Sequence, residues 1–391
     1  MLNTSLSPWP SFTQEEADAV SKVLLSNKVN YWTGTECREF EKEFAAFVGT
    51  QYTVALSNGT LALDVALKAM GIGAGDDVIV TSRTFLASAS CIVTAGANPV
   101  FADVDLNSQN ISAETIKAAL TPNTKAIIVV HLAGMPAEMD GIMDLAKEHD
   151  LWVIEDCAQA HGAKYKGKSV GSIGHVGAWS FCQDKIMTTG GEGGMVTTND
   201  KELWSKMWSY KDHGKSYDAV YHREHAPGFR WLHESFGTNW RMMEMQAVIG
   251  RIQLKRMPEW TAHRQAHAAK LAESLGKFAS IRLIEVADYI EHAQYKFYAF
   301  VKPEHLKDGW TRDRIVNELN ARKVPCYQGS CSEVYLEKAF DNTPWRPKER
   351  LKNAVQLGDT SLMFLVHPTL TDDEIAFCKE HIEAVLAQAT A

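Results

Sequence analysis

The sequence predicts an α/β protein in which a large domain with a mostly parallel sheet precedes a smaller α+β domain. Three observations support this fold class. Short apolar segments alternate with helical patterns through the first two-thirds of the 391 residues. Several of these segments are apolar throughout, which is typical of strands buried on both faces of a parallel sheet. After about residue 255 the pattern changes to a mixture of strands and longer helices.

The large domain is predicted to contain seven strands joined by crossover helices. Helix residues follow Gly59, where Leu63, Leu67 and Met70 recur at helical spacing, and Gly71 is suited to end that helix. Two further helices are predicted at 113–120 and 140–149. Strand and helix in repeated alternation indicate a doubly wound α/β domain. The predicted strands are 52–56, 78–81, 99–102, 126–131, 151–155, 178–181 and 195–198.

The smaller domain is predicted from a helix at 262–275, a strand at 295–301, and helices at 311–320 and 372–387. We therefore expect three regions: an N-terminal segment, 1–30, that packs on the small domain; the large domain, 31–254; and the small domain, 255–391.

Composition narrows the possible functions. The formal net charge is −8, so the chain has no general attraction for nucleic acid or anionic lipid. No apolar run approaches 18 residues and no signal peptide is visible, so we expect no membrane contact and a cytoplasmic location. The seven cysteines lack metal-ligand spacing, so no metal site is predicted and the thiols are expected to be free.

One lysine stands just beyond a predicted strand end. Lys185 follows the segment that begins at Ser180, and the glycine-rich stretch 190–194 comes shortly after it. Ligands of open α/β sheets bind outside strand ends, and glycines let the backbone approach a ligand closely. A neutral lysine there is a nucleophile. The alternative is a surface lysine before a glycine turn.

Two other strand ends carry polar residues of complementary chemistry. Glu155 and Asp156 end an apolar strand, where a buried carboxylate needs a cation, although such acids are also common helix caps. The segment Ser57–Thr60 joins a strand to a helix, and its free backbone N–H groups could bind an anion. The alternative is that it is an ordinary helix N-cap. A phosphate cup, then an acid, then a lysine is the order found in fold-type I enzymes that use pyridoxal phosphate.

The chain also resembles the DegT/DnrJ/EryC1/StrS family of sugar aminotransferases over essentially its full length. The resemblance implies a fold-type I aminotransferase with pyridoxal 5'-phosphate as cofactor, L-glutamate as amino donor, a keto sugar as acceptor, and a homodimer with shared active sites. It rests on the segments 32–34, 57–60, 124–128, 130–134, 154–156, 180–181, 191–194, 212–214 and 238–242, together with Lys185.

The family's site residues carry over to matching positions. Lys185 would hold the cofactor as a Schiff base and move protons, and Asp156 would pair with the pyridine nitrogen. Phe85 would stack on the ring, unless it is a plain core residue, and Gln159 would bond the ring hydroxyl. The resemblance places four further residues at the phosphate: Gly59, Thr60, Ser180 and, from the neighbouring subunit, Asn239.

Two departures from the family bear on the acceptor. The stretch 325–331, which contains Tyr327, stands where many members that use nucleotide-linked sugars have a histidine-tyrosine pair. The segment 211–231 is rich in cations, among them Arg223 and Arg230, and is either a solvated loop or a lid for an acidic substrate.

These departures favour 8-oxo-3,8-dideoxy-manno-octulosonate, aminated for lipopolysaccharide or O-antigen synthesis, as the expected acceptor. The alternative is a nucleotide-linked 4-keto-6-deoxyhexose, as in a perosamine-synthase-like enzyme. A sugar dehydratase is disfavoured, because the branch of this family that removes a hydroxyl has a histidine at the position of Lys185. A non-catalytic sugar-binding relative is disfavoured because the lysine and the acid are both intact.

Overall fold

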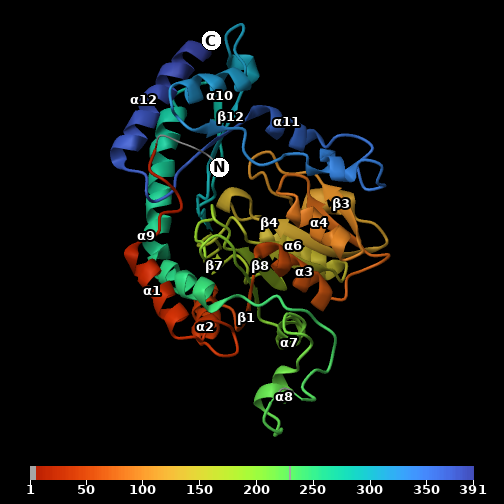
Figure 1. Ribbon diagram of the computed structural model, residues 1–391. Helices are drawn as coiled ribbons and strands as arrows, with labels where there is room; N and C mark the ends of the chain where they lie inside the picture. Colours follow the sequence, from red (N-terminus) through yellow and green to blue (C-terminus); the bar gives the residue numbers. More distant parts are fainter. Residues whose placement is uncertain (1–5, 229) are drawn as a thin grey trace.

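The computed structural model describes residues 6–228 and 230–391 (Figure 1). Its central sheet has seven strands in the order β1-β9-β8-β5-β4-β2-β3. The five strands from β8 to β3 are parallel, whereas β9 is antiparallel to both of its neighbours. The fold class expected from the sequence is therefore confirmed. The strands are β1 (Tyr52–Leu56), β2 (Asp77–Thr81), β3 (Asn98–Ala102), β4 (Thr124–Val130), β5 (Trp152–Asp156), β8 (Val176–Ser180) and β9 (Gly194–Thr198).

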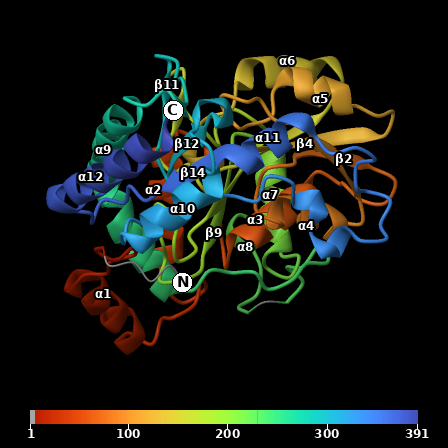
Figure 2. The ribbon, with the colours of Figure 1, turned by 90° about the horizontal axis from the view of Figure 1, so that it is seen from above.

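Helices cover both faces of this sheet, because successive side chains of β4 pack into two different apolar clusters. Ile128 packs in one apolar cluster with residues of α3 (Gly59–Ala69) and α4 (Ala87–Thr94). Ile127 packs in another with residues of α5 (Ala113–Ala119) and α6 (Met139–Glu148). Seen from above, α5 and α6 lie on one side of the sheet and α3 and α4 on the other (Figure 2). The first cluster also includes α2 (Glu36–Val48) and α7 (Lys201–Tyr210), and α8 (Tyr217–Tyr221) follows α7.

The C-terminal part of the chain builds a second, antiparallel sheet in the order β10-β12-β14-β13. A small sheet, β11-β6-β7, joins the two parts of the chain. These strands are β10 (Ile281–Leu283), β12 (Phe297–Val301), β13 (Cys326–Tyr327), β14 (Ser361–Phe364), β11 (Ile290–Glu291), β6 (Lys164–Tyr165) and β7 (Lys168–Ser169). The helices here are α10 (Arg312–Ala321), α11 (Lys352–Thr360) and α12 (Asp372–Ala389).

One long helix, α9 (Glu244–Leu275), runs without a break through residue 255, where the sequence placed the boundary between the domains. Because the helix belongs to both parts, the boundary stays a prediction. The sequence indicated a helix only from residue 262, because Pro258 lies in the interior and removes a backbone donor. Packing on both sides of the proline stabilises the continuous helix: its first half contacts α2 and α1 (Gln14–Leu25), and its second half contacts α12.

The N-terminal segment contacts both parts of the chain. In α1, Glu16 accepts a hydrogen bond from Gln253 of α9 at 2.8 Å. Ser7 donates to Glu374 of α12 through its backbone N–H at 2.6 Å. Within the part of the chain that the structure describes, no helix combines the length and apolarity needed to span a bilayer.

Candidate active site

A pocket of about 620 Å³ opens at the carboxyl ends of the parallel strands. Connections that follow β1, β2, β5 and β8 meet there because parallel strands end at the same edge of the sheet. Seven of the predicted cofactor contacts lie together in its wall. The polar and aromatic residues of that wall are Asn58, Gly59, Thr60, Thr84, Phe85, Ser88, Asp156, Gln159, Ser180, Asp184, Lys185 and Glu192.

Lys185 lies in this wall five residues after the end of β8, and its side chain is only 17% exposed. Its Nζ lies 3.8 Å from Asp184 Oδ1 and 5.4 Å from the centre of the Tyr295 ring. Its carbonyl oxygen accepts a hydrogen bond from Trp9 Nε1 at 2.8 Å. The lysine is therefore held between the large sheet and residues from both ends of the sequence, and is not a surface residue before a turn.

Asp156 ends β5 and is buried at the base of the pocket. Its Oδ2 accepts a hydrogen bond from Ser88 Oγ at 2.8 Å, and its Oδ1 accepts one from the Ala158 N–H at 3.1 Å. Burial raises the pKa of Asp156, while these hydrogen bonds and the charge of Lys185 oppose the rise. The carboxylate is thus fixed in orientation but still lacks a close cation, as a site for a protonated ring nitrogen requires.

A second hydroxyl supports Ser88. Thr84 Oγ1 and Ser88 Oγ lie 2.8 Å apart in a hydrogen bond, and both residues are buried. This pair was not predicted from the sequence. The spacing could have indicated it, since the two hydroxyl residues are four apart on either side of Phe85, at the connection that follows β2.

The connection from β1 to α3 forms a cup at the helix N-terminus. Asn58 is the N-cap, and its side chain accepts a hydrogen bond from the Leu61 N–H at 3.0 Å. Gly59 lies so close to Ser180 that an added Cβ would stand 2.4 Å from the Ser180 Cβ. Asn58 therefore caps the helix, and it lines the pocket together with Gly59, Thr60 and Ser180, at a helix N-terminus of the kind that suits an anion.

Phe85 and Gln159 complete the wall. Phe85 is 71% exposed, which rules out a plain core phenylalanine. Gln159 Oε1 accepts a hydrogen bond from the Ala133 N–H at 2.8 Å. That contact orients the amide so that its N–H groups are the atoms left to donate toward a ligand.

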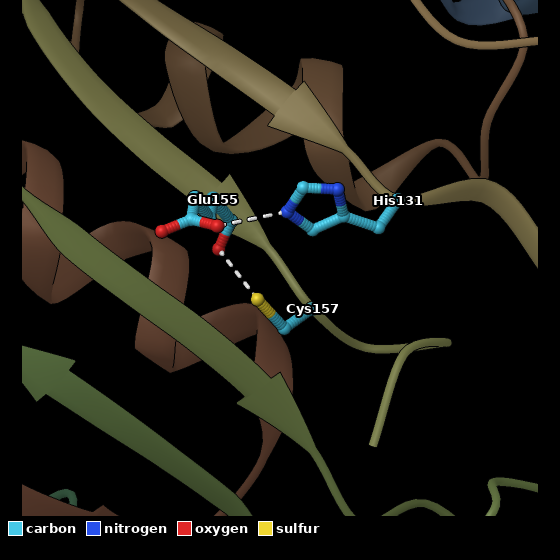
Figure 3. Close-up of side chains that lie close together, drawn as sticks. All are labelled: His131, Glu155 and Cys157. Atoms are coloured by element: carbon cyan, nitrogen blue, oxygen red, sulfur yellow. Dashed lines mark hydrogen bonds and ion pairs between the residues drawn. The ribbon is translucent and has the colours of Figure 1, made fainter. Parts of the chain in front are cut away.

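Glu155 precedes Asp156 in the sequence but plays a different role. It is buried beside His131 and Cys157 (Figure 3), and one of its oxygens lies 3.0 Å from His131 Nε2. Burial raises the pKa of Glu155, but hydrogen bonds from His131 and from backbone N–H groups outweigh that effect and lower it. Those N–H groups belong to Gly171, Ile173 and Gly174.

His131 is also fully engaged, since its Nδ1 accepts a hydrogen bond from the Ala137 N–H at 3.0 Å. The donor and acceptor atoms of this pair are therefore already satisfied by the protein, so the cluster supports the strand ends beneath the pocket and offers little to a metal ion. Of these two neighbouring acids, Asp156 lines the pocket and Glu155 does not.

Four predicted site residues do not line this pocket: Asn239, Arg223, Arg230 and Tyr327. Asn239 and Arg230 are exposed, and Tyr327 is half-buried in β13. Arg223 is also exposed, and its guanidinium is bound by acids of its own segment, with Nε 2.9 Å from Asp218 and a second contact to Glu234. A single chain therefore brings together seven of the predicted cofactor residues, but neither Asn239 nor the predicted sugar contacts.

Comparisons with known proteins show which proteins the chain is similar to. The sequence profile of the DegT/DnrJ/EryC1/StrS aminotransferase family matches residues 10–383. The fold matches the crystal structure of an aminotransferase from Psychrobacter cryohalolentis with a TM-score of 0.96 and 65% identity, over 98% of this chain and 99% of that one. Among curated proteins, the chain is 41% identical to GDP-perosamine synthase from Escherichia coli O157:H7, over 95% of this chain and 96% of the relative.

A further relative is named for a different sugar. The chain is 42% identical to a UDP-N-acetyl-3-dehydro-alpha-D-glucosamine 3-aminotransferase from Acidithiobacillus ferrooxidans, over 91% of this chain and 90% of the relative. Both relatives are named for nucleotide-linked sugars, although the nucleotides differ.

Proposed function

The chain belongs to the DegT/DnrJ/EryC1/StrS aminotransferase family, and from this premise we propose that it moves the amino group of L-glutamate onto a nucleotide-linked keto sugar. It is a sugar aminotransferase, and its cofactor is pyridoxal phosphate. The observation that carries the proposal is the convergence of Lys185, Asp156 and the β1–α3 cup in one pocket.

The residues present fit this cofactor. Its phosphate matches the cup at Gly59, Thr60 and Ser180, where the start of α3 offers N–H groups and the positive end of the helix dipole. Its ring nitrogen matches the buried carboxylate of Asp156. When bound, pyridoxal phosphate supplies an aldehyde that takes up an amino group and a ring that withdraws electrons.

Lys185 and Asp156 would carry the chemistry that the protein contributes. The Lys185 amine would hold the cofactor aldehyde until the donor takes its place, and it would then be free to carry a proton between the two carbon atoms on either side of the transferred nitrogen. Asp156 keeps the proton on the ring nitrogen, because an ionised carboxylate stabilises the cationic ring and a neutral group does not. Ser88 holds that carboxylate in place.

The other pocket residues would bind and orient the cofactor. Phe85 offers an exposed ring face for stacking, and Gln159 offers its amide N–H groups to the ring hydroxyl. Asn239 lies outside the pocket of its own chain, so we propose that it reaches the phosphate of a second subunit in a homodimer.

The acceptor proposal differs from the first expectation. The sequence departures favoured 8-oxo-3,8-dideoxy-manno-octulosonate, which carries no nucleotide. Two relatives that match most of this chain, at 41% and 42% identity, are named for a GDP-linked and a UDP-linked sugar. This supports the alternative, a nucleotide-linked keto sugar, with a 4-keto-6-deoxyhexose as the first acceptor to test.

Separate half-reactions test the proposal. The purified holoenzyme is mixed with L-glutamate, and the visible absorbance of the bound cofactor is followed. The aminated enzyme is then freed of glutamate and given each keto sugar, and the products are identified by mass spectrometry. We expect amination of a nucleotide-linked sugar. Amination of the octulosonate alone would reverse the choice of acceptor, and amination of no sugar would reject the proposal.

A further inference from the structure

Two cationic side chains stand on the small-domain side of Lys185, and neither has an ion-pair partner of its own among the residues that the structure describes. They are Arg264, in the second half of α9, and Lys296, just before β12. Both lie around Tyr295, which itself lies against Lys185. We call Arg264 and Lys296 the cationic pair.

Arg264 is buried with most of its hydrogen-bonding capacity unused. The residue is 1% exposed, and its Nη1 donates to the Tyr295 carbonyl oxygen at 3.3 Å. Among the described residues, no acceptor meets its Nε or Nη2. A buried guanidinium with unsatisfied N–H groups costs free energy, so these atoms favour an additional acceptor that bears negative charge.

Lys296 has a similar deficit at a position that solvent can still reach. Its Nζ lies 4.7 Å from the centre of the Tyr295 ring, and no carboxylate of the described chain lies within ion-pair distance. Burial lowers the pKa of Lys296 to about 8; the charge of Asp184 opposes this, and the charges of Arg264 and Lys185 add to it. An anion bound beside Lys296 would restore the ammonium form.

The surrounding groups do not neutralise the pair. Asp184 is the acid nearest to the cluster, and it is already bound by the Tyr295 hydroxyl at 2.5 Å and lies 3.8 Å from Lys185 Nζ. Burial lowers the pKa of both His161 and His367 to about 3, so these imidazoles are neutral. Asp184 is therefore shared by Lys185 and Lys296, and no carboxylate of the described chain forms an ion pair with Arg264.

Tyr295 links the cationic pair to the reacting position. Asp184 and Lys185 line the cofactor pocket, and Lys185 Nζ and Lys296 Nζ lie 5.4 and 4.7 Å from the centre of the Tyr295 ring. An amino-acid donor must bring its amine to the point where the Lys185 amine holds the cofactor. Its carboxylate would then project beside that point.

We propose that Arg264 and Lys296 form an anion subsite that binds a carboxylate of the amino-acid donor. The inference rests on the proposed function in that the donor is a dicarboxylic amino acid. It goes beyond that function because it assigns donor recognition to the small-domain wall. The keto sugar would bind elsewhere in the pocket.

The first test uses glutarate, which has both carboxylates of glutamate but no amine. Its affinity for the holoenzyme is measured by calorimetry for the wild type, Lys296→Met and Arg264→Lys. We expect Lys296→Met to weaken glutarate binding about 10- to 150-fold, the range for losing one charge-assisted contact. Arg264→Lys keeps the charge but loses the planar fork, so its loss should be smaller. Lys125→Met is the matched control, because Lys125 is exposed on β4 and lies outside the pocket wall.

The second test separates this proposal from the proposed function. The glutamate half-reaction and the sugar half-reaction are measured separately for the same variants, the latter from enzyme loaded with pyridoxamine phosphate. We expect Lys296→Met to impair only the glutamate half-reaction. L-Glutamine and γ-aminobutyrate, which each lack one carboxylate, identify the carboxylate that the pair binds.

Three results would overturn the subsite. The first is a Lys296→Met variant with unchanged glutarate affinity and an unchanged glutamate half-reaction. The second is a Lys296→Met variant whose sugar half-reaction is impaired equally. The third is a wild-type enzyme that binds glutarate no better than chloride, which would make this a site for solvent anions only. By contrast, failure of every keto sugar with normal glutarate and glutamate results would reject the proposed acceptor and leave the subsite standing.

Discussion

At the scale of single residues, Lys185 is expected to carry chemistry and not cofactor affinity. Most residues that would hold the phosphate and the ring are other residues of the pocket wall. We therefore predict that Lys185→Ala folds, retains pyridoxal phosphate and gives no turnover. Cofactor content by absorbance and steady-state amination check this. Substantial amination by the variant would assign the proton transfer to a different residue.

Ser88 offers a test of how Asp156 is held. Ser88→Ala removes the 2.8 Å hydrogen bond to the Asp156 carboxylate, which at a charged group is worth about 1.5–3 kcal/mol. Because that bond favours the ionised form, its loss should raise the pKa of Asp156 further and weaken its hold on the ring nitrogen.

We predict that Ser88→Ala lowers kcat about tenfold or more. We also expect a shift in the pH at which the bound cofactor's absorbance changes. Ser88→Thr keeps the hydroxyl and should restore both properties. Equal loss in the alanine and threonine variants would indicate a packing role instead.

Lys296 predicts a pH dependence for binding of dicarboxylates. The pKa of Lys296 is lowered to about 8, so its ammonium form predominates below pH 8 and its neutral amine above. Asp184 stays ionised because its pKa is lowered. Burial lowers the pKa of Arg264 to about 9, but a delocalised guanidinium keeps its proton inside proteins, so Arg264 stays charged across this range. The charged and titratable groups that face Lys296 are Asp184, Lys185, Arg264, Tyr295 and His367.

Glutarate affinity for the holoenzyme should therefore fall as pH rises through about 8, by up to about tenfold per pH unit. Glutarate suits this measurement because it has no amine that titrates in the same range. The Lys296→Met variant should show weaker but pH-independent binding between pH 7 and 9. A wild-type profile that is flat across this range would contradict the assignment.

At the scale of elements, the junction of β1 and α3 depends on a glycine for steric reasons. A Cβ at Gly59 would lie 2.4 Å from the Ser180 Cβ and 2.9 Å from its Cα. The backbone of β8 would have to move, at a cost of about 1–3 kcal/mol, and the phosphate cup would open. We predict that Gly59→Ala weakens cofactor affinity and lowers Tm.

Gly73→Ala is the matched control for Gly59→Ala. Gly73 follows the same helix, and the nearest atom to an added Cβ is 3.7 Å away, an ordinary contact. Cofactor affinity by equilibrium titration and Tm by calorimetry distinguish the two variants. If Gly59→Ala binds the cofactor normally, the cup does not hold the phosphate.

The sequence predicted those elements whose signals are local. All seven strands of the central sheet were located within two residues at each end, because buried parallel strands are apolar without interruption. Lys185 and Asp156 were found because each stands beside a strand end. The first half of α9 was missed because Pro258 hides a helix that tertiary packing stabilises.

Contacts between distant residues were not predictable from local patterns. Trp9 reaches Lys185 across 176 positions, and Arg264 meets Tyr295 across 31. No periodicity signals such pairs, since their meeting depends on how α9 and the N-terminal segment pack. The cationic segment 211–231 suggested a substrate lid, but Arg223 is bound by neighbouring acids that its residue type alone did not reveal.

At the scale of the whole molecule, the exposed aromatic residues suggest where a second subunit lies. Trp231 is 93% exposed and Phe236 is 99% exposed, and Asn239 follows them closely. Phe85, in the pocket wall, is 71% exposed. Large exposed apolar side chains mark interaction surfaces, so this arrangement supports a homodimer in which the 231–239 segment approaches the partner's pocket.

Mixed dimers provide a decisive test of a shared site. A closed dimer has twofold symmetry, so each of its two pockets would combine Lys185 of one subunit with Asn239 of the other. Lys185→Ala removes the proton carrier, and Asn239→Asp places a negative charge beside the phosphate. Each variant alone should be nearly inactive, because both of its pockets carry the defect.

Co-refolding the two variants in equal amounts should restore activity. In a mixed dimer, one pocket would collect both substitutions and the other would collect neither. Half of the dimers are mixed and each has one intact pocket, so about a quarter of wild-type activity should return. If Asn239 served the pocket of its own chain, every pocket would carry one defect and no activity would return. The recovered fraction therefore tells whether the active site belongs to one chain or to the dimer.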